Sequence, residues 1–266
     1  MVDFRYKRRS ASIALRAAVL APMSLCFIAA AAAEESKHQE EAPPANWSGV
    51  YVGVHDGFGW GNTDWTFPLE EFYNVDPGDG FSIKPDGFIA GGHILLLRQF
   101  RRVVVGVEAA YSKGTISDDR VGVVTAAFPE DRFETDIRDM GSISARLGYA
   151  AGIWQLYAKA GWASAEVQHN AWSGEPVAGV IADVGGRVNG YIVGGGVEYM
   201  LTPDISVGVQ YDFSRFGAKQ YSTLTTGASP GLPFNVEIDD ITVHAVTSRV
   251  SFRIGDWPQE LEPPHK

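Results

Sequence analysis

Eight segments of the chain alternate apolar with small or polar residues, and this pattern constrains the fold more than any other feature. Successive side chains of a β-strand point to opposite faces, so each segment predicts a strand with one apolar and one polar face. In one of them Ile205, Val207 and Val209 share a face, opposite Ser206 and Gly208. Bounded by Gly, Pro, Asp and charge clusters, the segments are residues 48–60, 87–97, 103–112, 140–150, 154–165, 188–201, 205–216 and 241–254.

The connections between these segments are alternately long and short, without exception. In chain order they contain 26, 5, 27, 3, 22, 3 and 24 residues. A strand that crosses a bilayer needs about 9–11 residues, and bacterial barrels join an even number of strands by long extracellular loops and short periplasmic turns. We therefore predict an all-β fold: an eight-stranded antiparallel up-and-down transmembrane β-barrel with four long extracellular loops and three short periplasmic turns.

The first segment is unusually rich in glycine. It reads NWSGVYVGVHDGFGWG, and Gly53, Gly57 and Gly59 share one parity. We expect these glycines to point inward, because a barrel of eight strands is only wide enough for side chains to fill. Asp56 falls on the opposite, lipid-facing parity. Either a β-bulge turns Asp56 inward, or it lies near the outer interface, where a charge costs little.

The N-terminus differs from the rest of the chain. Lys7, Arg8, Arg9 and Arg16 precede an apolar run that ends in alanines, which is the pattern of a cleaved secretory signal peptide. We expect the domain order to be signal peptide 1–33, flexible periplasmic leader 34–45, barrel 46–254 and C-terminal tail 255–266, with export through the Sec route. Cys26 lies inside the signal peptide, so the mature chain would contain no cysteine and no disulfide.

The charge balance argues against nucleic acid as a partner. The chain holds 22 Lys and Arg against 32 Asp and Glu, and residues 1–33 account for five of the former and one of the latter. The mature chain is left with 17 against 31, a formal net charge of −14. Nucleic-acid-binding surfaces are basic instead.

Five motifs in this order resemble one family, the small porin-family (OmpA/OmpX-like) eight-stranded outer-membrane barrels of alphaproteobacteria. They are NWSGVYVGVHDGFGWG, VVVGVEAAYS, ARLGYA, LYAKAGWA and VGGGVEYML. The resemblance implies insertion into the cell outer membrane by the outer-membrane assembly machinery, and no particular activity. The chain departs from the family at Asp56, at Gln210 and in the tail DWPQELEPPHK, which follows the last strand where relatives commonly end on an aromatic residue.

Charged residues occupy the inward parity of several predicted strands. Opposite charges on neighbouring strands can pair across a narrow lumen and block it. Glu108 and Arg146 stand at nearly the same height, so we expect them to pair. The expected lumen charge network comprises Glu108, Arg146, Lys159, Glu198, Asp212, Arg249 and Arg253.

Histidines supply the weak candidates for a ligand site. His55 and His93 share the inward parity of adjacent strands, where two imidazoles could bind a metal or haem iron, but no third ligand is evident. His244 and Ser248 share the outward parity of the last strand, about 13 Å apart, too far for a nucleophile and its base. We expect no enzyme activity, no cofactor and no metal.

The predicted loops are acidic. Carboxylates such as Asp118, Asp119 and Asp136 could hold divalent cations that bridge to lipopolysaccharide phosphates. The sequence favours a non-enzymatic barrel that supports envelope integrity and surface interaction, with outer-membrane lipid, lipopolysaccharide and an extracellular ligand as partners. A haem-binding or host-ligand-binding surface protein and a small-solute porin remain the alternatives.

Overall fold

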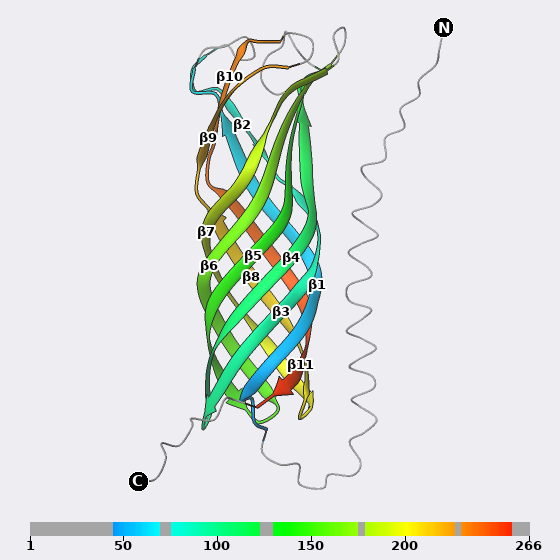
Figure 1. The fold of residues 1–266 in the computed structure, drawn as a ribbon, viewed down its shortest axis with the longest axis vertical. Helices are drawn as coiled ribbons and strands as arrows, with labels where there is room; N and C mark the ends of the chain where they lie inside the picture. Colours follow the sequence, from blue (N-terminus) through cyan, green and yellow to red (C-terminus); the bar gives the residue numbers. More distant parts are fainter. Residues whose placement is uncertain (1–44, 70–75, 123–129, 175–178, 227–229, 257–266) are drawn as a thin grey trace, which may run out of the picture. The chain divides into compact units, whose positions relative to one another are not determined.

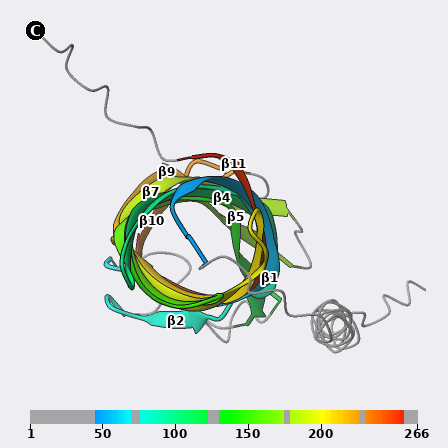
Figure 2. The ribbon, with the colours of Figure 1, turned by 90° about the horizontal axis from the view of Figure 1, so that it is seen from below.

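The computed structural model describes residues 45–69, 76–122, 130–174, 179–226 and 230–256. These residues form one closed β-barrel (Figures 1 and 2). The predicted signal peptide, nearly all of the leader and most of the tail lie outside the described residues. In the described part, no helix is long and apolar enough to cross a membrane.

Eight strands form the barrel wall, and each pairs with its neighbours in antiparallel fashion. The last of them pairs with the first along its length, which closes the ring. The predicted all-β fold, an eight-stranded antiparallel barrel, is therefore confirmed. The wall strands are β1 (Gly49–Thr66), β3 (Asp86–Phe100), β4 (Val103–Val121), β5 (Arg132–Ala151), β6 (Trp154–Ser173), β7 (Gly179–Thr202), β8 (Ile205–Phe216) and β11 (Ile241–Gly255).

Three further strands lie where the sequence predicted loops. They are β2 (Gly80–Ile83), which pairs with the end of β1, and the hairpin formed by β9 (Lys219–Leu224) and β10 (Pro233–Ile238). Strand β10 also pairs with β1. All three lie at the end of the barrel that carries the long connections (Figure 1).

Most wall strands are longer than predicted. Strand β4 continues nine residues past the predicted end at 112, and β5 begins eight residues before the predicted start at 140. The predicted boundaries were wrong because the two faces exchange polarity there. In these extensions Ile116 and Ile137 are buried inside the barrel, while Lys113 and Arg132 are exposed on its outer surface. An outer wall surrounded by water, with a packed interior, requires this arrangement.

The register fixes the tilt of the strands. Phe100 of β3 pairs with a residue of β4, which pairs with a residue of β5, and so on around the ring. When this row of paired residues returns to β3, it does so at Ala90, ten residues from Phe100. Eight strands with this stagger are tilted by about 40° to the barrel axis. Figure 1 shows the inclined strands. The row runs through Phe100, Val103, Tyr149, Leu156, Val197, Val209, Ser248, Asp56 and Ala90.

Two groups of exposed aromatic residues bracket an aliphatic belt on the outer surface. Strand β6 carries one residue of each group, Trp154 and Trp162, and both side chains are about half exposed. Aromatic girdles mark the two interfaces of outer-membrane barrels. The lower girdle contains Phe100, Tyr149, Trp154 and Phe252, and the upper girdle contains Trp60, Phe88, Tyr111, Trp162, Tyr191 and Tyr211. The strands extend well past the upper girdle, so the barrel wall protrudes beyond the membrane.

Candidate functional site in the barrel lumen

An apolar plug closes the end of the lumen that carries the short turns, which the sequence predicts to be the periplasmic end. The residues that precede β1 turn Trp47 into the lumen, where its side chain is fully buried. Its indole Nε1 donates to the carbonyl of Gly152 at 3.2 Å, and its backbone N–H donates to Gln99 Oε1 at 2.8 Å. The plug consists of Trp47, Tyr51, Leu95, Leu97, Val104, Ala150 and Met200.

Above the plug lies a charged layer centred on Glu108, which is 1% exposed. Lys159 Nζ donates to Glu108 Oε1 at 2.8 Å, and Arg249 Nη2 donates to Glu108 Oε2 at 3.1 Å. Arg146 Nη1 lies 3.6 Å from the same Oε2. Three cations therefore converge on one buried carboxylate, which lowers the cost of holding each of these charges away from water.

Two more carboxylates complete the layer. Glu198 accepts a hydrogen bond from Arg146 Nη1 at 3.1 Å and lies 3.3 Å from Arg249 Nε. Asp212 lies 3.2 Å from Lys159 Nζ. The layer therefore contains three basic and three acidic side chains, whose formal charges cancel.

The structure brings six of the seven predicted network residues together. Glu108 and Arg146 are in contact, but Glu108 has closer partners and Arg146 bonds chiefly to Glu198. Register explains this, because the residue of β4 that pairs with Arg146 is Gly106. Arg253 stands apart in the plug, where its Nε donates to Tyr51 Oη at 3.2 Å.

Sequence reasoning missed Tyr157, which organises the arginines. The guanidinium of Arg146 stacks on the Tyr157 ring with Cζ 3.3 Å from its centroid. Arg249 Nη1 donates to the Tyr157 hydroxyl at 3.1 Å, and that hydroxyl donates to Gln210 Oε1 at 2.6 Å. The sequence did contain one indication of this role, because Tyr157 lies two residues before Lys159 on β6 and therefore faces inward as Lys159 does.

His55 and His93 do meet inside the barrel. Their rings stack with centroids 5.6 Å apart, and their Nδ1 atoms are 3.3 Å apart. His55 Nε2 is 2.7 Å from Ser112 Oγ, and His93 Nε2 is 2.9 Å from Ser251 Oγ. Each ring nitrogen thus has a protein partner. The ring of His93 also packs closely over Gly53, where a Cβ atom would approach Val250 and the ring far too closely.

Above the charged layer, the lumen contains a small cavity of about 60 Å³. Its polar wall includes His55, Lys159 and Asp212, and its apolar wall includes Ile192 and Phe216. A space of this size holds a few water molecules. Among the described residues, no group of three or more His, Cys, Asp or Glu side chains could hold a metal ion.

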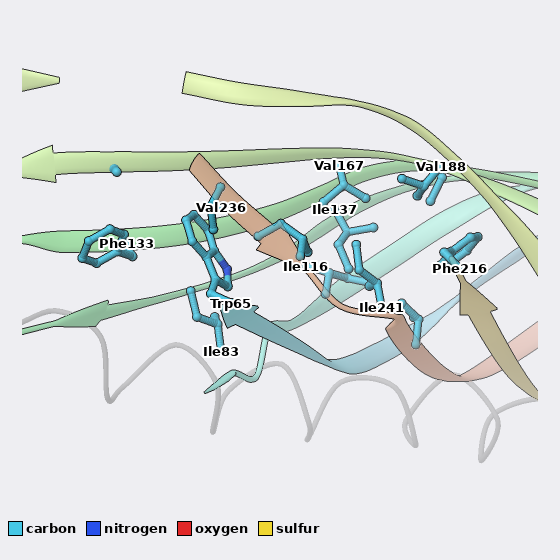
Figure 3. Close-up of a cluster of buried hydrophobic side chains, with 14 of the residues drawn as sticks. Trp65, Ile83, Ile116, Phe133, Ile137, Val167, Val188, Phe216, Val236 and Ile241 are labelled. Atoms are coloured by element: carbon cyan, nitrogen blue, oxygen red, sulfur yellow. The ribbon is translucent and has the colours of Figure 1, made fainter. Parts of the chain in front are cut away.

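A large apolar core fills the barrel beyond the cavity (Figure 3). Side chains of the wall strands, such as Trp65 and Phe133, pack here against residues of β2 and β10, such as Val236. The Trp65 ring lies 5.7 Å from that of Phe133 and 5.6 Å from that of Phe81. This outer core closes the extracellular end of the lumen, as the plug closes the periplasmic end.

His169 is buried in the outer core, seven residues beyond the upper-girdle Trp162 and therefore outside the membrane. Its Nδ1 is 3.1 Å from Thr135 Oγ1, and its ring packs edge-on against Trp65 and Tyr221. Burial, assisted by the charge of Lys219, lowers the pKa of His169 to about 3. A neutral imidazole is therefore the stable form in this core.

We expect the outer core to weaken in acid because of His169. Its folded pKa lies below the ordinary 6.5, so the stabilisation is complete above pH 6.5 and is lost as the pH falls toward 3, by about 1.4 kcal/mol per pH unit. Hydrogen exchange of the β9–β10 hairpin between pH 7 and pH 4 measures this. His169→Gln should abolish the slope, and an unchanged slope in that variant would contradict the assignment.

Two outward-facing residues also have clear positions. Asp56 is exposed on the outer surface, and the pairing of β1 with both neighbours continues through it. Of the two alternatives for Asp56, the structure excludes a bulge that turns it inward, and Asp56 lies just below the upper girdle. His244 stacks on Trp60 and its Nδ1 is 2.7 Å from Tyr211 Oη, which makes it part of that girdle.

A closed eight-stranded barrel with an aliphatic belt between aromatic girdles defines a transmembrane β-barrel of the outer-membrane class. Comparison with known proteins gives the family. The model for the outer membrane protein beta-barrel domain matches residues 18–247, and the chain belongs to this family. The protein is therefore an outer-membrane β-barrel protein, and the predicted location in the outer membrane is confirmed.

Two similar proteins from Brucella are named as outer-membrane proteins. The 25 kDa outer-membrane immunogenic protein of Brucella abortus is 31% identical over 221 residues, covering 81% of this chain and 89% of the relative. The 31 kDa outer-membrane immunogenic protein of Brucella melitensis is 22% identical, covering 77% and 89%. Neisserial surface protein A is a similar solved structure, with a TM-score of 0.37, 13% identity and coverage of 78% and 98%.

Proposed function

We propose that the protein is a non-enzymatic, non-conducting barrel that supports the envelope and presents its outer wall and loops at the cell surface. The observation that carries this proposal is the filled lumen. An apolar plug, a layer of ion pairs and an apolar core succeed one another along its length. A solute would have to displace all three layers to pass.

The outer wall supports the part of the proposal that concerns surface interaction. Beyond the upper girdle, the described strands expose more carboxylates than cationic side chains. The exposed carboxylates include Asp119, Glu166 and Asp183. Divalent cations could bridge such groups to lipopolysaccharide phosphates. The Brucella relatives are named as immunogenic outer-membrane proteins, which is compatible with a surface-exposed position for this chain as well.

The haem-binding alternative has less support inside the barrel. The ring nitrogens of His55 and His93 are already occupied by Ser112, by Ser251 and by each other. The adjoining cavity of about 60 Å³ has no room for a porphyrin. Haem would therefore have to bind on the outer surface. Titration of the refolded protein with haem, compared with His55→Gln/His93→Gln, separates a lumenal site from a surface site.

Single-channel recording in planar bilayers tests the sealed lumen. We expect insertion of the refolded protein without discrete conductance steps, because the described lumen has apolar layers at both ends. A general porin inserted under the same conditions provides the positive control, and heat-modifiable migration shows that the sample is folded. Regular openings in most insertion events would refute the proposal and favour a small-solute porin.

A further inference from the structure

The turn between β3 and β4 concentrates positive charge at the periplasmic rim. Arg98, Arg101 and Arg102 lie within five residues, and all three side chains are exposed. The turns at 152–153 and 203–204 contain no cation. In a chain with 32 acidic and 22 basic residues, three arginines within five residues are not explained by composition.

The backbone of this turn gives an independent reason to look for a role. Phe100 pairs with Val103, so Arg101 and Arg102 form the whole loop. Arg101 has a φ of 56°, the only positive φ at a non-glycine residue in the described part of the chain. Gly152 holds the same first position in the β5–β6 turn, with a φ of 64°.

A two-residue hairpin loop with a positive φ at its first position favours glycine there, because a Cβ atom is penalised in that conformation. The β5–β6 turn follows this preference and the β3–β4 turn does not. Unfavourable backbone conformations of this kind cluster at functional sites. The φ of Arg101 therefore marks this turn as a candidate functional site.

The surroundings of the turn suit the membrane interface. The Arg98 guanidinium lies over the Phe100 ring, with Cζ 5.2 Å from its centroid. Arg102 Nη1 donates to the Tyr149 hydroxyl at 2.9 Å. Phe100 and Tyr149 belong to the lower girdle, so the arginines lie at the depth of lipid headgroups. Guanidinium groups bind phosphate through paired N–H donors and are weakly hydrated.

We propose that Arg98, Arg101 and Arg102 form a binding site for the phosphate group of an anionic phospholipid in the periplasmic leaflet. A lipid held there places its acyl chains along the exposed aliphatic residues of β3 and β4, including Ile94 and Val105. Clustered arginines beside a membrane surface attract anionic lipids in this way. The site lies on the outer rim of the barrel and is independent of whether the lumen is sealed.

Native mass spectrometry of the folded protein in a neutral detergent tests the site. The protein is titrated with phosphatidylglycerol or with phosphatidylcholine, and the retained lipid is counted. We expect about a tenfold preference for phosphatidylglycerol, reduced to less than about twofold in Arg98→Gln/Arg101→Gln/Arg102→Gln. The control Lys113→Gln/Arg138→Gln/Arg187→Gln removes the same charge from the outer wall and should keep the preference.

Two results of this titration would overturn the proposal. One is a wild-type protein without any lipid preference, and the other is an equal loss in the outer-wall control, which would mean that net charge alone attracts the lipid. Inorganic phosphate and a soluble peptidoglycan fragment are added as competitors. Displacement of the lipid by either one at equimolar concentration would show that the turn recognises a free anion or the cell wall instead of a lipid headgroup.

Arg101→Gly tests the conformational argument. Glycine should relieve the backbone penalty and raise the folding equilibrium constant in phosphatidylcholine vesicles about fivefold. The same variant should lose part of the preference for phosphatidylglycerol. A lower folding constant would show that Arg101 stabilises the turn, and an undiminished lipid preference would remove Arg101 from the site.

Discussion

Glu108→Gln is expected to reduce the free energy of unfolding by about 3–5 kcal/mol. The substitution keeps the shape of the side chain but removes the buried charge that Lys159, Arg249 and Arg146 share. Two of these cations, Lys159 and Arg249, would then lack their closest anion in a buried layer. Urea titration of the protein folded into lipid vesicles, followed by tryptophan fluorescence, measures the change.

A double-mutant cycle locates the main partner. Coupling between Glu108→Gln and Lys159→Met should be on the order of 2–3 kcal/mol. Coupling between Glu108→Gln and Arg146→Met should be smaller, because Arg146 retains Glu198. As a control, Glu166→Gln removes an exposed carboxylate 3.9 Å from Arg187 and should change the stability by less than about 0.5 kcal/mol. Equal coupling in both cycles would mean that the layer has no preferred pairs.

Trp65→Ala is expected to destabilise the outer core by about 3–5 kcal/mol. Trp65 is 1% exposed, contacts Phe81, Phe133 and His169, and donates from Nε1 to Thr135 Oγ1 at 3.1 Å. Its loss leaves a cavity where β1 meets β2 and the β10 strand. We expect faster proteolysis at the extracellular end, while the membrane-embedded part of the barrel stays folded.

Trp172→Ala provides the matched comparison for this prediction. Trp172 lies on the outer wall, partly exposed, with the Arg132 guanidinium over its ring at 5.5 Å. Removal of this ring should cost about 1 kcal/mol or less and should leave the proteolysis rate unchanged. If Trp65→Ala were cleaved no faster than Trp172→Ala, the outer core would not be what holds the extracellular strands together.

The sequence was informative wherever lipid contacts the wall. Residues such as Val107, Ile143 and Leu156 must be apolar on that face, and the opposite face must be small or polar, so alternation alone located eight strands and their facing. The same parity placed Glu108, Arg146 and Lys159 in one lumen. It did not assign partners, because pairing across a barrel depends on the stagger of ten residues that only the closed ring defines.

Beyond the upper girdle, the sequence pattern was misleading. In this part of the wall the apolar residues, such as Ile116, Phe133 and Ile137, lie on the inner face. The strand prediction required an apolar outer face, so it ended each strand where water replaces lipid outside the barrel. The sequence by itself determined the class of fold, the eight strands of the barrel wall and the identity of the inward charges, since each follows from the local period of two. Only the tertiary structure decided how far the wall extends, which charges meet and how the lumen is closed, because these depend on contacts between residues far apart in the chain.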